Sequence, residues 1–176
     1  MQFERRTEVS TRSLCAPPPT RLRVAGQWSY LYRAVDSTGA TIDFWFSAER
    51  DAAAAKRFFQ RALKVPGRGR PRVINVDGNP SYPKVVTELK QERNLGRRCR
   101  CRTCPYLNNN LEQDHRAIKR RVNASQGFRS FDGAWRTLQG YEVLHMIRKG
   151  QVRWLPKGDV VGQVQFVNDM FGLKTA

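Results

Sequence analysis

The sequence predicts a single α/β domain in which helices pack against a mixed sheet. Its 176 residues are a length typical of one domain. Apolar residues make up 40% of the chain and aromatic residues 10%, enough for a hydrophobic core. A β-hairpin pattern over residues 28–46 is followed by helical and strand patterns in alternation, which is typical of a mixed sheet with helices on it.

The chain begins with a segment that we expect to be a loose arm, residues 1–22. Three consecutive prolines, Pro17 to Pro19, lack the N–H that a helix or a sheet needs, and no regular period surrounds them. The first strand pattern is the aromatic and β-branched run 28–35, and a turn leads to a second strand over 41–46. These two runs predict the hairpin.

Apolar spacing and capping residues then predict the remaining elements. A helix over 50–64 precedes a short buried-type strand, 72–76, that ends at Asp77. Further helices are expected from Ser81 to about Gln91, from Asn108 or Asn109 to Val122, and from a Ser130 cap over 131–149, closed by Gly150; residues 93–107 look irregular, with a short strand. The expected organisation is an arm (1–22), a core (23–150) and a tail (151–176) that is either a strand or a packing arm.

The charge balance indicates a polyanionic partner. The 32 Lys and Arg against 15 Asp and Glu give a net charge of +17, and Arg outnumbers Lys by 24 to 8. Such an excess excludes a protein that binds basic partners and favours nucleic acid, although an Arg-rich solvated surface is the plainer explanation. No run is long and apolar enough for a membrane span and no secretory signal is visible, so we expect a cytoplasmic, nucleoid-associated protein.

Three of the four cysteines cluster as Cys99, Cys101 and Cys104, with Cys15 on the arm. Zinc takes four ligands, and the one nearby candidate, His115, is expected to face the core beside Leu111 and Ile118. A zinc site is therefore not expected. The stretch 90–121 also holds ten basic residues, Arg97 and Arg98 among them, against three acids. This excess favours a loop that grips phosphates beside the active site, with an ordinary solvated loop as the alternative.

Two carboxylates occupy positions suited to metal-assisted chemistry on phosphate. Asp77 follows a short buried strand, and open α/β sheets bind ligands beyond the carboxyl ends of their strands. Glu112 follows after 34 intervening residues, in the first turn of a helix whose face it shares with Arg116 and Lys119. An acid that binds Mg²⁺ beside bases that hold DNA would explain this face, and an ordinary surface ion pair would explain it equally.

Several strings resemble the catalytic core of bacterial insertion-sequence DDE transposases, in particular the family that moves by replicative cointegrate formation. The resemblance covers about three quarters of the chain, from Arg23 to about Gln151. The first matching segment runs from Arg23 through Val24, Ala25, Gly26, Gln27 and Trp28 to Asp36. The other matching strings are Val73-Ile-Asn-Val-Asp77, Tyr106-Leu-Asn-Asn-Asn-Leu-Glu-Gln-Asp-His-Arg-Ala-Ile-Lys-Arg-Arg121, Gly127-Phe-Arg-Ser-Phe131 and His145-Met-Ile-Arg-Lys-Gly150.

This resemblance implies a ribonuclease-H-like, retroviral-integrase-like fold. It implies that Asp77 and Glu112 are the second and third catalytic acids and ligands of Mg²⁺ or Mn²⁺, and that Lys119 contacts the terminal DNA. The neighbouring bases Arg116, Arg120 and Arg121 are candidate DNA contacts on the same helix, and the expected activity is metal-dependent cleavage and joining of transposon ends to target DNA.

The chain departs from the family at its first catalytic acid. The family carries an Asp-Glu-Thr-Tyr string on the strand before the hairpin, and counting back from Arg23 puts that Asp at Pro18, with only Thr20 retained. The upstream helix-turn-helix region is also missing, as a truncation or frameshift would produce. We therefore expect a fold that lacks a proper first strand and an impaired enzyme, with Asp36 a weak candidate for the missing ligand.

The rival hypothesis is a non-catalytic nucleic-acid-binding protein, such as a transposition inhibitor. It would occupy transposon ends or full-length transposase subunits, and the chain could also pair with itself. Asp77, Glu112 and Lys119 favour the enzyme lineage, whereas Pro18 favours the rival for this chain.

Overall fold

The computed structural model describes residues 13–66, 69–104, 118, 120, 122 and 127–173. Its strands are β1 (Ser13–Ala16), β2 (Thr20–Val24), β3 (Gln27–Asp36), β4 (Thr41–Ser47), β5 (Val73–Val76) and β6 (Arg100–Thr103). Its helices are α1 (Ala52–Leu63), α2 (Ser81–Gln91), α4 (Phe131–Arg148) and α5 (Val160–Met170), and Ile118, Arg120 and Val122 are also helical. The expected hairpin, the strand before Asp77 and the helices near 50–64, 81–91 and 131–149 are thereby confirmed.

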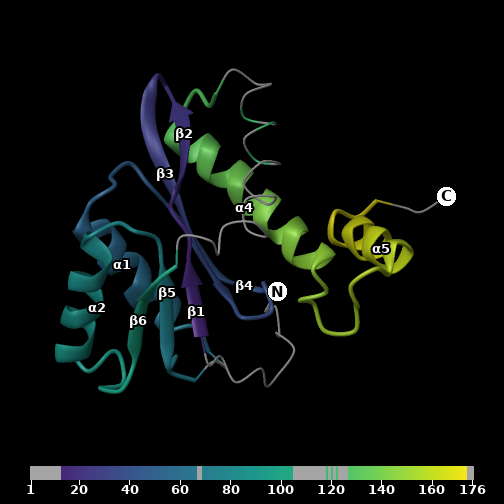
Figure 1. The fold of residues 1–176 in the computed structure, drawn as a ribbon. Coiled ribbons are helices and arrows are strands. Elements are labelled where there is room, and N and C mark those ends of the chain that lie inside the picture. Colours follow the sequence, from purple (N-terminus) through teal and green to yellow (C-terminus); the bar gives the residue numbers. More distant parts are fainter. Residues whose placement is uncertain are drawn as a thin grey trace.

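The strands form one mixed, six-stranded sheet with β3 at a branching position (Figure 1). β4 pairs antiparallel with one edge of β3, and β1 and β2 share its other edge, also antiparallel. β1 then pairs in parallel with β5, and β5 with β6. This arrangement makes β1 a central strand, because it has a partner on each side.

The first strand corrects two expectations. Residues 13–16 and 20–22 are in strands rather than in a loose arm, and the fold does not lack its first strand. The strand is instead interrupted: Cys15 pairs with Val35 and Thr20 with Leu31, so five steps along one strand match four along β3. The proline run absorbs the extra residue as a bulge, where its missing N–H groups do not break the ladder.

Alternation explains why the segments beside the prolines still form strands. Leu14 and Ala16 are buried on one face of the sheet, and Thr20, Leu22 and Val24 are buried on the other. The period of two was hard to recognise in the sequence because each segment is only four or five residues long and a bulge separates them.

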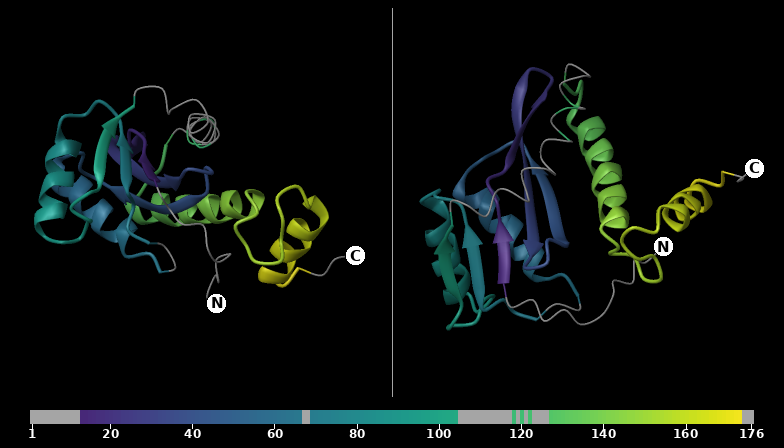
Figure 2. Two further views of the ribbon diagram at one scale, coloured as in Figure 1. Left: turned by 60° about the horizontal axis from the view of Figure 1, so that its bottom comes forward. Right: turned by 45° about the vertical axis from the view of Figure 1, so that its right-hand side comes forward.

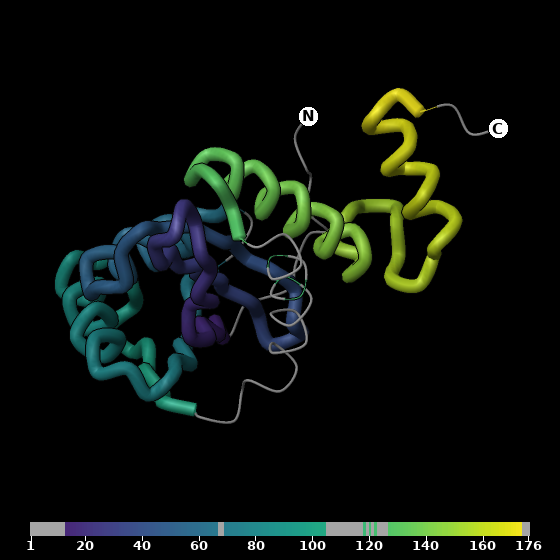
Figure 3. The backbone as a smooth tube through the Cα atoms, turned by 90° about the horizontal axis from the view of Figure 1, so that it is seen from above, coloured from purple at the N-terminus to yellow at the C-terminus, as the bar shows by residue number. Residues whose placement is uncertain are grey.

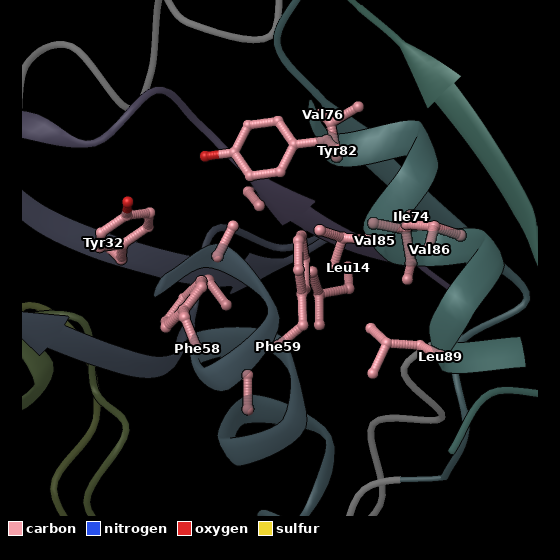
Figure 4. Packing of buried hydrophobic residues seen from close by; sticks show 14 of the residues in the cluster. Leu14, Tyr32, Phe58, Phe59, Ile74, Val76, Tyr82, Val85, Val86 and Leu89 are labelled. Carbon is pink, nitrogen blue, oxygen red and sulfur yellow. The ribbon is translucent and has the colours of Figure 1, made fainter. Parts of the chain in front are cut away.

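Helices cover both faces of the sheet. On one face, α1 and α2 bury Phe58, Phe59, Tyr82 and Leu89 against Ile74 of β5 and its neighbours (Figure 4). On the other face, α4 and the helical residues Ile118 and Val122 pack on β2, β3 and β4 (Figure 2). The prediction that Ile118 faces the core is confirmed, and Val122 is buried beside it.

Tyr32 and Tyr82, both buried in the core beneath α1 and α2, predict that the stability of the fold decreases at high pH. Burial, the main cause, raises the pKa of Tyr32 to about 12. Burial and, secondarily, the Asp77 carboxylate also raise the pKa of Tyr82. In the unfolded chain both titrate near pH 10, so their contribution to stability is complete below about pH 10 and is lost as the pH rises through the folded values.

We therefore expect the free energy of unfolding to fall between about pH 10 and 12, by up to about 1.4 kcal/mol per pH unit for each tyrosine. Urea titrations across this range measure the slope. Tyr32→Phe should flatten it, and equal slopes for the variant and the native chain would contradict the prediction.

Residues 160–170 of the tail form a helix, α5, and not a strand, whereas the residues before it contact the fold: Gln151 exchanges hydrogen bonds with the backbone of Thr41, and Leu155 is 8% exposed. Asp159 caps α5 through Oδ1, which accepts a hydrogen bond from the Gly162 N–H at 2.9 Å. The helix buries none of its residues, and Val161 is 79% exposed. Figure 3 shows α5 at the end of an extension beyond α4, away from the sheet.

Because no residue of α5 is fully buried, ending the chain after Gly158 is expected to change the free energy of unfolding by less than about 1 kcal/mol. Urea unfolding of the shortened and native chains, monitored by tryptophan fluorescence, tests this. A loss of several kcal/mol would mean that α5 supports the core.

The capping predictions have mixed outcomes. Ser130 caps α4 by accepting a hydrogen bond from the Gly133 N–H at 3.2 Å, as predicted. Ser81 is the first residue of α2 rather than its cap, and Pro80 holds the cap position without a side-chain hydrogen bond. No described helix is long and apolar enough to cross a membrane.

Candidate active site at the carboxyl edge of the sheet

Three parallel strands end together beside Asp77. Ala16 of β1 pairs with Val76 of β5, and Val76 pairs with Thr103 of β6. The next positions along these strands are Pro17, Asp77 and Cys104, and the Cys104 N–H donates to the Val76 carbonyl at 3.0 Å. The sequence prediction that Asp77 stands at the carboxyl end of a strand is confirmed, and the proline run that follows β1 begins at the level of Asp77.

Asp77 is half-buried and its local geometry is set by a turn. Its Oδ1 accepts a hydrogen bond from the Asn79 N–H at 3.2 Å, which leads the chain into α2. Two residues before Asp77, Asn75 donates a hydrogen bond from Nδ2 to the sulfur of Cys15 at 3.4 Å. Cys15 is the partner of Asn75 on β1, so the two side chains lie on the same face of the sheet. Burial raises the pKa of the Cys15 thiol, the Asn75 hydrogen bond partly opposes this rise, and Cys104 and Asp36 add smaller increases.

The other proposed site residues on the later helix lie mostly outside the described residues. These are Glu112, Arg116, Lys119 and Arg121, and their predicted roles stay predictions. Arg120 is described and exposed. The packing of Ile118 and Val122 fixes which face of the sheet this helical stretch covers, namely the face of Leu31 and Phe46.

Asp36 does not serve as a replacement acid at this edge. It ends β3 opposite Leu14 and is 3% exposed. Its Oδ1 accepts hydrogen bonds from Thr38 N, Thr38 Oγ1 and Ala40 N at 2.9, 2.6 and 3.0 Å. The carboxylate therefore builds the hairpin turn, as its sequence pattern indicated.

Arg97 and Arg98 are exposed, but they are not beside Asp77. They precede β6, and Arg100 donates its backbone N–H to the Arg72 carbonyl at the start of β5. Since β5 and β6 are parallel, this loop lies at the amino edge of the sheet, opposite the edge that holds Asp77. The expectation of a phosphate-gripping loop next to the site is wrong in its location, because the short strand β6 carries the chain across the sheet before the later helix begins.

The described residues do not form a complete two-metal site. Metal-assisted phosphoryl transfer uses several carboxylates around a pair of ions, and only Asp77 supplies one at this edge. Within the described parts of the chain, no three His, Cys, Asp or Glu side chains are grouped so that they could hold a metal ion. Cys99 is buried in the core with α1 and α2, and burial raises its pKa.

One buried ion pair beside the proline bulge was not expected from the sequence. Arg33 of β3 donates from Nε to Glu142 Oε1 of α4 at 2.6 Å, and its Nη2 contacts the same oxygen. The two side chains are 3% and 0% exposed. Glu142 continues the buried face of Ala134 and Leu138 at intervals of four residues, a spacing that could have revealed it.

Comparisons with known proteins agree with this architecture. Residues 19–151 match the family described as a DDE domain. The chain is 38% identical over 136 residues to the transposase for the insertion sequence-like element IS431mec of Staphylococcus aureus strain N315, and equally to the transposase for IS257 in transposon Tn4003 of the same species. Each match covers 77% of this chain but only 58% of the relative.

Solved structures show the same fold at low identity. The HTLV-2 integrase catalytic core domain in complex with magnesium, in its dimeric form, has a TM-score of 0.55 and 16% identity, over 85% of this chain and 97% of that one. The catalytic domain of Mos1 mariner transposase has a TM-score of 0.53 and 17% identity, over 74% and 69%. The fold is thus ribonuclease-H-like, and by sequence the chain belongs to the insertion-sequence DDE transposases.

Proposed function

We propose that this chain is a DNA-binding catalytic-core segment of a transposase whose metal-dependent cleavage and joining of transposon ends is impaired. The observation that carries this proposal is the pairing of β1 with β5, because it sets the proline run next to Asp77. The family's first acid aligns with Pro18, so the site would have its second acid but not its first.

The ligands that remain are Asp77 and, by resemblance, Glu112, with Mg²⁺ or Mn²⁺ as the ion. Carboxylate oxygens suit either ion. A pair of ions held between the reacting oxygens would speed an in-line displacement at phosphorus. Two carboxylates hold one ion weakly and cannot bridge a pair, which is the physical reason for impairment.

DNA binding would be carried by phosphate contacts. The net charge of +17 and the predicted basic face of Arg116, Lys119, Arg120 and Arg121 support this part of the proposal. Phosphate contacts position a protein without reading sequence, so binding should be largely sequence-independent. The expected partners are transposon ends, target DNA and further transposase subunits, with the nucleoid as the place of action.

A salt series tests the DNA-binding part. We expect similar affinities for a transposon-end duplex and a scrambled duplex, and a steep linear fall of log affinity with log salt concentration for both. Fluorescence anisotropy with labelled duplexes measures this. A strong preference for the end sequence with little salt dependence would contradict sequence-independent phosphate binding.

The second candidate function is a non-catalytic DNA-binding protein that inhibits transposition. Pro18 favours it, since a chain with no first acid could still occupy DNA or join full-length subunits. A joining assay with pre-cut ends, with and without active full-length transposase, distinguishes the two. A chain that leaves the transposase's rate unchanged, and joins ends weakly by itself, favours impaired catalysis over inhibition.

A further inference from the structure

Two arginines and a tryptophan form a cluster on the hairpin of β2 and β3. Arg21 and Arg23 of β2 pair across the ladder with Tyr30 and Trp28 of β3. The Arg21 Cζ lies 4.5 Å from the centroid of the Trp28 ring, and the Arg23 Cζ lies 5.5 Å from it. We refer to Arg21, Arg23 and Trp28 as the arginine–tryptophan cluster.

The cluster points away from the helices of the opposite face. Thr20, Leu22 and Val24 alternate with the two arginines and are buried toward α4 and Ile118. Arg21 and Arg23 therefore project from the other side of β2, where both are exposed, and Trp28 is 46% exposed. Figures 1 and 2 show the β2–β3 hairpin extending past α1 and α2.

The charges of this cluster are not neutralised by carboxylates of the described chain. No ion pair of the described residues includes Arg21 or Arg23, whereas Arg57 pairs with Glu49 at 3.2 Å and Arg61 with Asp43 at 3.0 Å. Arginines on α1 are thus compensated within the fold, and those on the hairpin are not. Two exposed guanidinium groups beside an indole, with no carboxylate partner among the described residues, form a surface suited to an anion.

The geometry suits a repeating anion better than a single one. Residues two apart on a strand are separated by roughly 6.8 Å, and one strand of B-DNA carries a phosphate for about every 3.4 Å of its axis. Both guanidinium groups lie within cation–π distance of the Trp28 ring, which favours these arginine positions and leaves N–H groups for phosphate oxygens.

We propose that the arginine–tryptophan cluster is a second contact surface for the backbone of duplex DNA, separate from the predicted basic face of residues 116–121. This inference rests on the proposed function for the class of its ligand. It adds a location that no resemblance assigned, on the opposite side of the sheet from Ile118. A chain with both surfaces would hold two DNA segments, one on each face.

The test compares two double variants that lose the same net charge. Arg21→Gln/Arg23→Gln removes the uncompensated pair, and Arg57→Gln/Arg61→Gln removes two arginines that Glu49 and Asp43 already neutralise. Anisotropy titrations with one duplex across a salt series give the slope of log affinity against log salt for each chain. We expect the slope to shrink by about 2 for the first variant, about 1 per lost phosphate contact, and to stay unchanged for the second.

Two further variants separate the effect of the arginine charges from the effect of their contact with the Trp28 ring. Arg21→Lys/Arg23→Lys keeps the charge and should keep the slope, while Trp28→Leu keeps the slope but should weaken affinity severalfold because the arginines lose their platform. Circular dichroism checks that each variant is folded. A slope for Arg21→Gln/Arg23→Gln equal to that of the native chain would overturn the cluster proposal and leave the proposed function standing. A native chain that binds no duplex at any salt concentration would overturn both.

Discussion

Glu142→Leu is expected to lower the free energy of unfolding by about 3–5 kcal/mol, the largest effect on stability that we expect from a single substitution in this chain. Glu142 is fully buried on α4, and its Oε1 accepts a 2.6 Å hydrogen bond from Arg33 Nε. The substitution leaves the guanidinium of Arg33, which is 3% exposed, without its counter-charge inside the protein. Urea unfolding at neutral pH measures the loss.

The matched double variant separates the buried charge from packing. Arg33→Met/Glu142→Leu removes both charges and keeps similar side-chain volumes, so most of the lost stability should return. Lys56→Met serves as the exposed control: Lys56 pairs with Glu88 and Glu92 at 2.7 Å each on the surface, and its loss should matter far less and depend on salt. A double variant as unstable as Glu142→Leu would assign the loss to shape instead of charge.

The Arg33–Glu142 ion pair lies on the stretch of β3 that is opposite the proline bulge. Arg33 lies between Leu31, which pairs with Thr20, and Val35, which pairs with Cys15. The stretch of β3 that faces the proline bulge is therefore the stretch that anchors α4. The bulge is tolerated because strong contacts on β3 hold both ends of the interrupted strand in register.

Much of the fold could be predicted from the sequence, because strong local signals agreed with the final packing. The hairpin over 28–46 combines β-branched and aromatic strand residues with turn-forming residues between the strands, and α1 has a clear apolar face. The first strand could not be predicted, since its two segments are short and prolines obscure the alternation. The tail could not be assigned either, because α5 has apolar residues all round and buries none of them.

The site could be predicted in part for a similar reason. The location of Asp77 at the end of a buried strand could be predicted, because the apolar run that forms this strand directly precedes Asp77 in the sequence. Arg97 and Arg98 were assigned to the wrong edge because their location depends on the direction of β6, which only the sheet pairing reveals. The Arg33–Glu142 pair joins residues 109 apart in the sequence, and no local pattern specifies such a contact.

Restoring the first acid is the prediction with the largest expected effect on activity. The structure narrows the change that is needed: Thr20 and Leu22 are 2% exposed and already paired with β3, so only residues 17–19 require replacement. The variant Pro17→Met/Pro18→Asp/Pro19→Glu gives the bulge its missing N–H groups and sets a carboxylate next to Asp77. Pro18→Asp alone should restore little, because the rings of Pro17 and Pro19 still fix their own φ angles, and Pro19 still restricts the backbone of residue 18.

We expect the triple variant to join pre-cut transposon ends to target DNA in Mg²⁺ or Mn²⁺ at least about 10²-fold faster than the native chain, the scale on which one preorganised electrostatic group acts. Gel analysis of joined products measures the rate. Asp77→Asn and Glu112→Gln, each added to the triple variant, should return it to the background because both acids would be ligands of the same centre. Pro17→Met/Pro18→Asn/Pro19→Glu is the matched control that repairs the backbone without the charge.

The controls decide which property of the proline run matters. Joining by the triple variant but not by its Asn counterpart would assign the defect to the missing carboxylate, and joining by both would assign it to the backbone. Robust joining by the native chain that depends on Glu112 would contradict an impaired site, and a third ligand would have to come from elsewhere, such as Glu8. Asp36 could serve only if it gave up the three hydrogen bonds with which it builds the hairpin turn.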